Sequence, residues 1–227
     1  MVDRWIGMLL QKIEDLGLYE NTAVIFTSDH GFYLGDHGYM GKLVMTPKAL
    51  GYVPLYEEII RVPLMIRVPD VRGGKCCRAL VQPPDLTPII LELAEAKNPP
   101  MMQGRSLLPF IKGEDVAWRD LAVTSPSIIT GGWLSRPASG QRITMTTNEW
   151  ALMLRDNPGR RINLENLEKM VGKVGNELYD LSKDPMQKNN IYDKRKDAAE
   201  EIHSKLVMFL EEIGTKEEYL KYWRRLE

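Results

Sequence analysis

The chain has 227 residues, of which 44% are hydrophobic and 27% charged, and its formal net charge is −1. This composition is that of a soluble globular protein with one large domain, or one domain and a smaller companion. No basic stripe interleaved with aromatic residues is present, so no nucleic-acid partner is expected. The longest apolar runs are too short to cross a bilayer, and no signal peptide is visible before the first helix, so no membrane partner is expected. The compartment stays unknown.

The cysteines give no further information on the compartment. Cys76 and Cys77 are adjacent. A disulfide between neighbours is strained, and a metal site built from a cysteine pair usually needs spacing between them. We therefore interpret both as structurally incidental thiols.

The first half of the chain alternates helical and strand patterns. Apolar spacing predicts a core-facing helix over 2–16. The run 22–28 is nearly continuous in apolar character, which is typical of a buried parallel strand, and 62–68 predicts a second strand. Asp85 is expected to cap a helix over 86–96. This order favours an α/β layer over residues 1–113.

The second half has a different pattern. A short strand is predicted over 121–124, and an irregular loop over 125–140. Residues 142–147 and 149–155 predict a β-hairpin, and 177–181 a further strand. An amphipathic helix is expected over 198–213, where His203 has a solvated or a packing role. Residues 114–227 are thus expected to form a small α+β subdomain.

The best candidate site follows the first predicted strand. Two of the three histidines of the chain, His30 and His37, lie close together here, each directly after an aspartate. In open α/β sheets, ligands bind beyond the carboxyl ends of the strands. A metal or anion site is therefore expected at this loop.

Here the sequence resembles the sulfatases of the alkaline phosphatase superfamily. Ser-Asp-His-Gly at 28–31 is followed by Leu-Gly-Asp-His-Gly at 34–38 and by Gly-Lys at 41–42. Further segments in the family's order are 21–27, 56–58, 61–64, 85–90, 104–109 and 177–185, with Asn190. Each segment alone is a weak signal, but their ordered succession covers nearly the whole chain.

The resemblance implies both a fold and a reaction. The fold is α/β, with an alkaline-phosphatase-like mixed sheet flanked by helices, only partial here, and a small C-terminal α+β subdomain. The reaction is hydrolysis of a small-molecule or saccharide sulfate ester at a divalent metal, usually calcium. The family's nucleophile is a formylglycine made in a Cys/Ser-x-Pro-x-Arg motif.

The sequence departs from the family at that nucleophile. Its nearest match, Ser-Arg-Pro-Ala-Ser at 135–139, lacks the arginine and follows the metal-site strand instead of preceding it. We therefore expect a C-terminal portion of a sulfatase, without a nucleophile in this chain and inactive alone. An upstream sulfatase segment or a second copy is a possible partner.

The resemblance also implies roles for single residues. Asp29 and His30 are the expected metal ligands. The carboxylate suits a hard cation such as calcium, and imidazole at this position also suits manganese, zinc or iron. Lys42 is the expected catalytic lysine that contacts the sulfate. His37 is a second catalytic candidate, with an equally weighted structural role in orienting the loop. The segment 43–55 is expected to shape substrate access.

Other residues and functions stay open. Tyr56, Glu57, Glu58 and Arg61 fit a helix that packs on the sheet, with their charges solvated or in a buried pair. A histidine at position 30 also resembles the phosphodiesterases and phosphonate monoester hydrolases of the same superfamily. Hydrolysis of a phosphorus ester is therefore an alternative function. A non-catalytic module kept for binding or assembly is another.

Overall fold

The computed structural model describes residues 1–46, 49–52, 54–125, 143–154, 175–221 and 223–226. Within it the chain divides into two compact units. The first unit is Met1–Ser28 with Pro63–Trp118, and the second is Asp29–Val62 with Arg119–Glu227. This division differs from the expected one at 113/114, because Asp29–Val62 groups with the C-terminal residues. The predicted loop 125–140, including the Ser-Arg-Pro-Ala-Ser segment, lies almost entirely outside the described residues.

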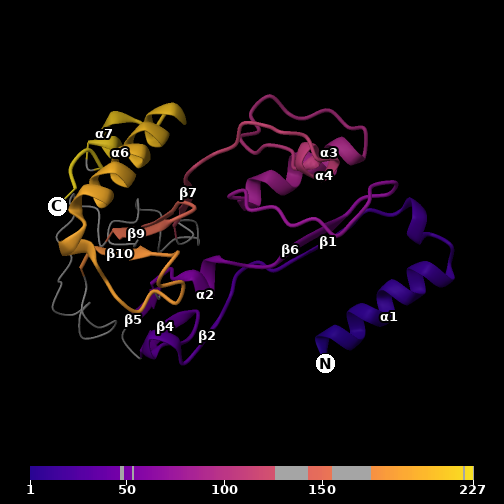
Figure 1. Cartoon of the computed structure of the whole chain (residues 1–227), viewed down its shortest axis with the longest axis horizontal. Helices are drawn as coiled ribbons and strands as arrows, with labels where there is room; N and C mark the ends of the chain where they lie inside the picture. Colours follow the sequence, from indigo (N-terminus) through magenta and orange to yellow (C-terminus); the bar gives the residue numbers. More distant parts are fainter. Residues whose placement is uncertain (47–48, 53, 126–142, 155–174, 222, 227) are drawn as a thin grey trace. The chain divides into compact units, whose positions relative to one another are not determined.

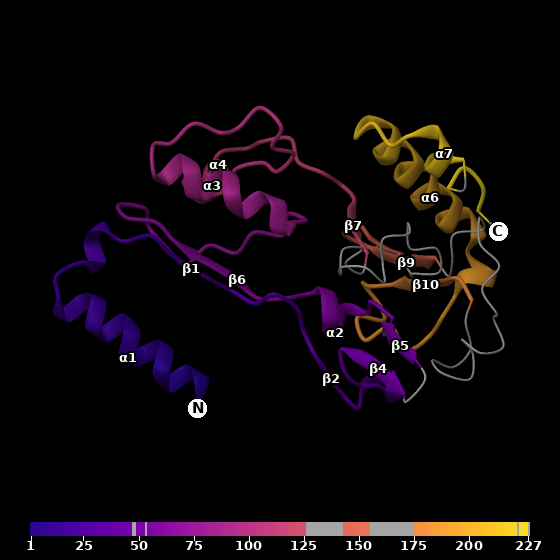
Figure 2. The same cartoon turned by 180° about the vertical axis from the view of Figure 1, so that it is seen from behind.

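The first unit holds a two-stranded ribbon and three α-helices (Figure 1). The strands β1 (Val24–Thr27) and β6 (Leu64–Arg67) pair antiparallel, with Val24 opposite Arg67. Helices α3 (Leu86–Leu93) and α4 (Leu108–Lys112) lie on one side of this ribbon, and α1 (Val2–Asp15) lies on the other (Figures 1 and 2). The core of the unit is built from Val68, Ile89, Leu107 and Leu108.

Three sequence predictions for this unit need correction. β1 was expected to be a buried parallel strand, but it is half-buried, and its one neighbour among the described residues is the antiparallel β6. Helix α1 forms as predicted, yet none of its residues is buried, and Trp5 is 61% exposed. Asp85 occupies the N-cap position of α3 as predicted, but its side chain makes no capping hydrogen bond to α3. It is fully buried and accepts hydrogen bonds from the amides of Gln82 and Arg105.

The second unit contains a four-stranded antiparallel sheet covered by a helix. The strand order is β10 (Glu177–Asp180), β9 (Trp150–Leu154), β8 (Ile143–Thr146) and β7 (Ala122–Thr124). The expected hairpin is β8–β9, in which Thr146 pairs with Ala151. Helix α6 (Lys196–Glu212) packs on this sheet through Ala198, Ala199, Ile202 and Leu206, and α7 (Glu217–Leu220) follows it. The predicted α+β subdomain is therefore present.

The remaining elements of the second unit are short and come from 29–62. Strands β2 (Tyr33–Leu34) and β3 (Met40–Gly41) form one hairpin, with a 3₁₀ turn at Asp36–Gly38. Strands β4 (Leu43–Thr46) and β5 (Ala49–Tyr52) form a second hairpin in the predicted substrate-access segment. Helix α2 (Glu57–Ile60) follows. A second core, of Tyr33, Leu55, Tyr56, Ile59, Met153 and Tyr179, joins these elements to the C-terminal sheet.

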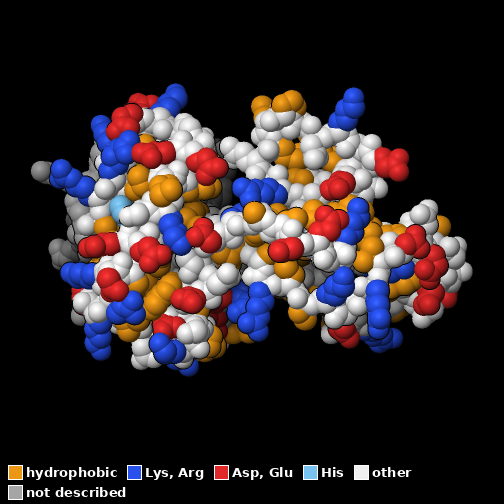
Figure 3. All heavy atoms as spheres, turned by 45° about the horizontal axis from the view of Figure 1, so that its top comes forward, with side chains coloured by type: hydrophobic (Ala, Val, Ile, Leu, Met, Phe, Trp, Pro, Cys, Tyr) orange, Lys and Arg blue, Asp and Glu red, His pale blue; other side chains and the backbone are white. Residues whose placement is uncertain are grey.

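The surface carries charges of both signs. On the face seen in Figure 3, basic and acidic side chains are interspersed rather than gathered into one stripe. Among the described residues, no helix has the length and apolar character that crossing a membrane requires.

His203 of α6 gives the fold a pH dependence. Its side chain is buried, so it has the packing role, and burial lowers its pKa although a backbone hydrogen bond with Trp223 acts in the opposite direction. The unfolded chain then binds the proton more readily, and the free energy of unfolding should fall as pH drops below about 6.5. Urea unfolding at several pH values measures this. His203→Gln should flatten the slope in that range, and an unchanged slope would contradict the assignment.

Candidate functional site

The hairpin β2–β3 brings the predicted site residues together. Asp29 and His30 precede β2, and Lys42 directly follows β3. Because Tyr33 pairs with Gly41 across the hairpin, the chain that enters it and the chain that leaves it lie side by side. Residues 12 apart in sequence therefore meet at the open end of the hairpin.

The contacts at this open end centre on the His30 ring. Its Nδ1 lies 2.7 Å from the Gly31 carbonyl oxygen, and its Nε2 lies 2.5 Å from Lys42 Nζ. A carbonyl oxygen can only accept, so we assign the proton to Nδ1. The Lys42 ammonium then donates to a lone pair on Nε2, and this arrangement describes a neutral imidazole beside a cation.

Asp29 adds a carboxylate to the same place. Its Oδ2 lies 3.3 Å from His30 Nε2, and its Oδ1 accepts a hydrogen bond from the His30 amide at 3.0 Å. Desolvation acts to raise the pKa of Asp29, but hydrogen bonds from backbone amides, that of His30 first, and the charge of the Lys42 ammonium outweigh it, so the pKa is lowered. Asp29 therefore presents a charged, exposed carboxylate.

The two predicted metal ligands fit part of a metal site. An oxygen and a nitrogen ligand that each lie about 2.0–2.4 Å from one metal, at a right angle to each other, are about 3 Å apart. The distance of 3.3 Å between Asp29 Oδ2 and His30 Nε2 is close to this value. Within the described ranges, however, no group of three or more His, Cys, Asp or Glu side chains converges. The described residues thus offer two donors of a set that calcium normally fills with six to eight oxygens.

Gly31 holds the loop against α2. Its amide donates to the Ile59 carbonyl at 2.8 Å, and the Phe32 amide donates to the Glu58 carbonyl at 3.1 Å. A Cβ at position 31 would lie 1.8 Å from the Glu58 carbonyl oxygen. Only glycine allows this approach of two backbones, which explains physically why glycine follows the Asp-His pair.

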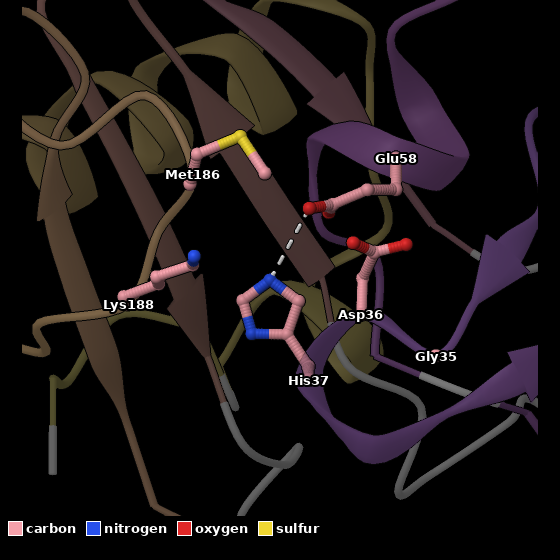
Figure 4. A pocket seen from close by; sticks show the side chains of 6 residues that line it. All are labelled: Gly35, Asp36, His37, Glu58, Met186 and Lys188. Atoms are coloured by element: carbon pink, nitrogen blue, oxygen red, sulfur yellow. Dashed lines mark ion pairs between the residues drawn. The ribbon is translucent and has the colours of Figure 1, made fainter.

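His37 lies at the other end of the hairpin, in its turn. It has a left-handed backbone with φ 51°, and its ring stacks on Tyr56 at 3.8 Å between centroids. Its Nε2 is 3.4 Å from Glu58 Oε1. Figure 4 marks this contact, which is an ion pair only when His37 is protonated, at a pocket of about 390 Å³ lined by Gly35, Asp36, His37, Glu58, Met186 and Lys188. His37 thus lines a pocket whose lining includes none of Asp29, His30 and Lys42.

Buried tyrosines connect this pocket to the C-terminal sheet. The hydroxyls of Tyr56 and Tyr179 both donate to Glu177 Oε2, at 2.6 and 2.8 Å. The Tyr33 hydroxyl donates to the Pro54 carbonyl at 2.6 Å and accepts from the Tyr56 amide. Burial raises the pKa of Tyr33 and of Tyr179, so both stay protonated donors. Tyr56, on which His37 stacks, is therefore held from two sides.

The structure thus brings Asp29, His30 and Lys42 together, and it places His37 elsewhere on the same hairpin. Glu58, expected to be solvated or in a buried pair, has the paired role with His37. Met186 and Lys188 had no sequence signal, because they follow the turn after β10 and reach the pocket only through the fold.

Comparison with known proteins gives the family. The sulfatase family model matches residues 1–96. N-acetylglucosamine-6-O-sulfatase of Bacteroides thetaiotaomicron is 30% identical over 216 residues, which are 93% of this chain and 33% of that protein. The solved structure of BT4656 in complex with its substrate D-glucosamine-2-N,6-O-disulfate superposes with a TM-score of 0.73 at 26% identity, over 95% of this chain and 39% of the other. The chain belongs to the sulfatase family.

The same comparisons confirm the expected fold class and set its extent. The chain spans about a third of the length of the curated relatives it matches, so it corresponds to a portion of a sulfatase with the alkaline-phosphatase-like fold. A phosphonate monoester hydrolase of Agrobacterium radiobacter shares this fold, with a TM-score of 0.70 at 22% identity, over 93% of this chain and 39% of the other. The fold alone therefore does not distinguish a hydrolase of sulfate esters from a hydrolase of phosphorus esters.

The Gly31 contact leads to a stability prediction. Gly31→Ala should lower the free energy of unfolding by about 3 kcal/mol or more, because the clash is with backbone rather than with a flexible side chain. Gly7→Ala is the matched control. Gly7 lies inside α1 with open space around it, so alanine there should stabilise by about 0.5–1 kcal/mol. Chemical unfolding measures both, and equal effects would contradict the close approach.

Proposed function

We propose that this chain forms part of a metal-dependent hydrolase of sulfuric esters, in which Lys42, His30 and Asp29 form one wall of the site. The observation that carries the proposal is the contact of the Lys42 ammonium with His30 Nε2 beside the exposed Asp29 carboxylate. A fixed cation next to metal-ligand donors is an arrangement suited to a sulfate group. The sulfatase relatives support the same assignment.

Each residue has a distinct role in this proposal. Sulfuryl transfer places negative charge on the oxygens of the sulfate, and a fixed ammonium such as that of Lys42 stabilises that charge. Asp29 and His30 would hold a divalent cation, with calcium favoured for the carboxylate and manganese or zinc for the imidazole. The Nε2 lone pair of His30, which accepts from Lys42 in this structure, would then bind the cation, and the Lys42 ammonium would contact the sulfate instead. That cation supplies further positive charge to the sulfate. The Gly31 carbonyl keeps the His30 ring oriented, with Nε2 turned towards the site.

The nucleophile is the missing part. The printed sequence contains no Cys/Ser-x-Pro-x-Arg, and the nearest segment, 135–139, lies outside the described residues. Removing a covalent nucleophile costs many powers of ten in rate. We therefore expect negligible turnover by this chain alone, and turnover when a sulfatase segment carrying the motif completes the site.

A sulfated saccharide is the proposed substrate class. The relatives include N-acetylglucosamine-6-O-sulfatase and a protein solved with a sulfated glucosamine. The alternative is a phosphorus ester, which His30 and the shared fold of the phosphonate monoester hydrolase keep open. An assembly module without catalysis is the third candidate, and it requires that no completed form of the protein turns over either ester.

The test is complementation. The chain is assayed alone and together with the motif-bearing segment of the Bacteroides relative, on N-acetylglucosamine 6-sulfate and on the matching phosphate ester. Sulfate release should appear only in the complemented form, and Lys42→Ala should lower it by about 10²–10³-fold. Lys194→Ala removes an exposed lysine of the same unit and should leave the rate unchanged.

Three outcomes would contradict the proposal. Robust sulfate release by the chain alone would show that its nucleophile lies in this chain. A strong preference for the phosphate ester would support the alternative. A complemented form that binds its two parts but hydrolyses neither ester would favour the assembly module.

A further inference from the structure

The pocket at the tip of the β2–β3 hairpin, lined by Gly35, Asp36, His37, Glu58, Met186 and Lys188, has no role in the chemistry proposed above. We call it the hairpin-tip pocket. It lies within one compact unit, and its lining comes from the hairpin turn, from α2 and from the segment after β10. Its volume of about 390 Å³ is within the range of small-molecule sites.

Hydrogen-bond acceptors dominate this pocket. Glu58 Oε2 is buried and has no hydrogen-bond partner among the described residues, although the other oxygen of the same carboxylate faces His37. Asp36 adds a second carboxylate, whose Oδ2 accepts a long hydrogen bond of 3.3 Å from the Leu34 amide. A buried carboxylate oxygen without a donor is costly, so a ligand that supplies a donor is favoured there.

The pocket also contains one cationic donor. In Figure 4, Lys188 and Met186 lie on one side of the hollow, and Asp36, His37 and Glu58 lie on the other. The formal charge of these side chains, with neutral histidine, is −1, because two carboxylates outnumber the single lysine. An acidic ligand is therefore disfavoured, whereas a ligand rich in hydroxyl and amino hydrogens matches the lining.

The walls are held in place before any ligand binds. His37 stacks on Tyr56, and the Tyr56 hydroxyl is fixed by the buried Glu177. Glu58 is carried by α2, whose carbonyls receive the amides of Gly31 and Phe32. Such preorganisation lowers the entropic cost of ordering the site on binding.

The pocket is separate from the candidate sulfate site but close to it along the chain. Asp29, His30 and Lys42 lie at the open end of the hairpin, and the two-residue strands β2 and β3 advance only about 7 Å towards the tip. One sugar unit of an oligosaccharide covers a comparable distance. A chain of sugars with its sulfate at Lys42 can thus place a neighbouring ring at the tip.

We propose that the hairpin-tip pocket binds a hexosamine ring next to the sulfate-bearing unit of the substrate. Glu58 Oε2 and Asp36 accept hydrogen bonds from the amino and hydroxyl groups of this ring, and Lys188 donates to one of its oxygens. The inference rests on the proposed function for the place of the sulfate. It adds a specificity site to that function.

The experiment titrates the chain with glucosamine and follows the ring signals of His30 and His37 by NMR, assigned with single His→Gln variants. Glucosamine should shift the His37 signal. Glucuronate, an acidic sugar of similar size, should bind at least about tenfold more weakly. Inorganic sulfate should shift the His30 signal and leave His37 in place.

Matched variants identify the groups involved. Asp36→Asn and Glu58→Gln should each weaken glucosamine binding by about tenfold, the loss expected for one charge-assisted hydrogen bond. Glu57→Gln is the control, because Glu57 precedes Glu58 in α2, pairs with Arg61 and does not line the pocket. Glu58→Gln also removes the contact of Glu58 with His37. The Asp36→Asn variant tests the pocket without changing that contact.

Two results would overturn the pocket assignment. One is an unchanged His37 signal in saturating glucosamine, and the other is equal weakening by Glu57→Gln and Glu58→Gln. Neither depends on hydrolysis. Sulfate release by the complemented enzyme without glucosamine binding would contradict the pocket assignment and support the sulfatase function. Glucosamine binding without sulfate release would contradict the sulfatase function.

Discussion

The backbone contact between Gly31 and α2 fixes the geometry of both candidate sites. Two hydrogen bonds, from Gly31 to Ile59 and from Phe32 to Glu58, join the start of the hairpin to the helix at a distance that excludes any side chain at position 31. Asp29 and His30 lie immediately before this contact, and the Glu58 carboxylate projects from its other side. A shift of the loop relative to α2 would therefore change the proposed metal ligands and the hairpin-tip pocket together.

The candidate site residues were named from the resemblance to the sulfatases, and no hairpin was predicted over 29–42. Asp29, His30 and Lys42 meet because the β2–β3 hairpin returns the chain to its starting point. The strands of the C-terminal sheet, in contrast, were readable from alternation and turn residues. These features depend on neighbours in sequence, which a single chain displays directly.

What could not be predicted depends on contacts between distant residues. The pairing of β1 with β6 in antiparallel sense is set by the path of the chain between them, which periodicity does not encode. Asp85 is the N-cap residue of α3, yet its carboxylate accepts from the Gln82 amide, in the capping box of the preceding 3₁₀ helix, and from the Arg105 amide, 20 residues away. Lys188 reaches the pocket only because the chain turns after β10. In each case the deciding contact lies outside the element that the local pattern describes.

The two ends of the hairpin differ in charge, and this difference separates their proposed tasks. At the open end, the Lys42 ammonium faces a neutral imidazole, and this surrounding favours an anion such as sulfate once a metal balances Asp29. At the tip, two carboxylates surround His37, and this surrounding favours donors. Because Tyr56 and Glu177 anchor the tip to the C-terminal sheet, that sheet fixes the position of the hairpin-tip pocket, on which the proposed binding of a saccharide next to Lys42 depends.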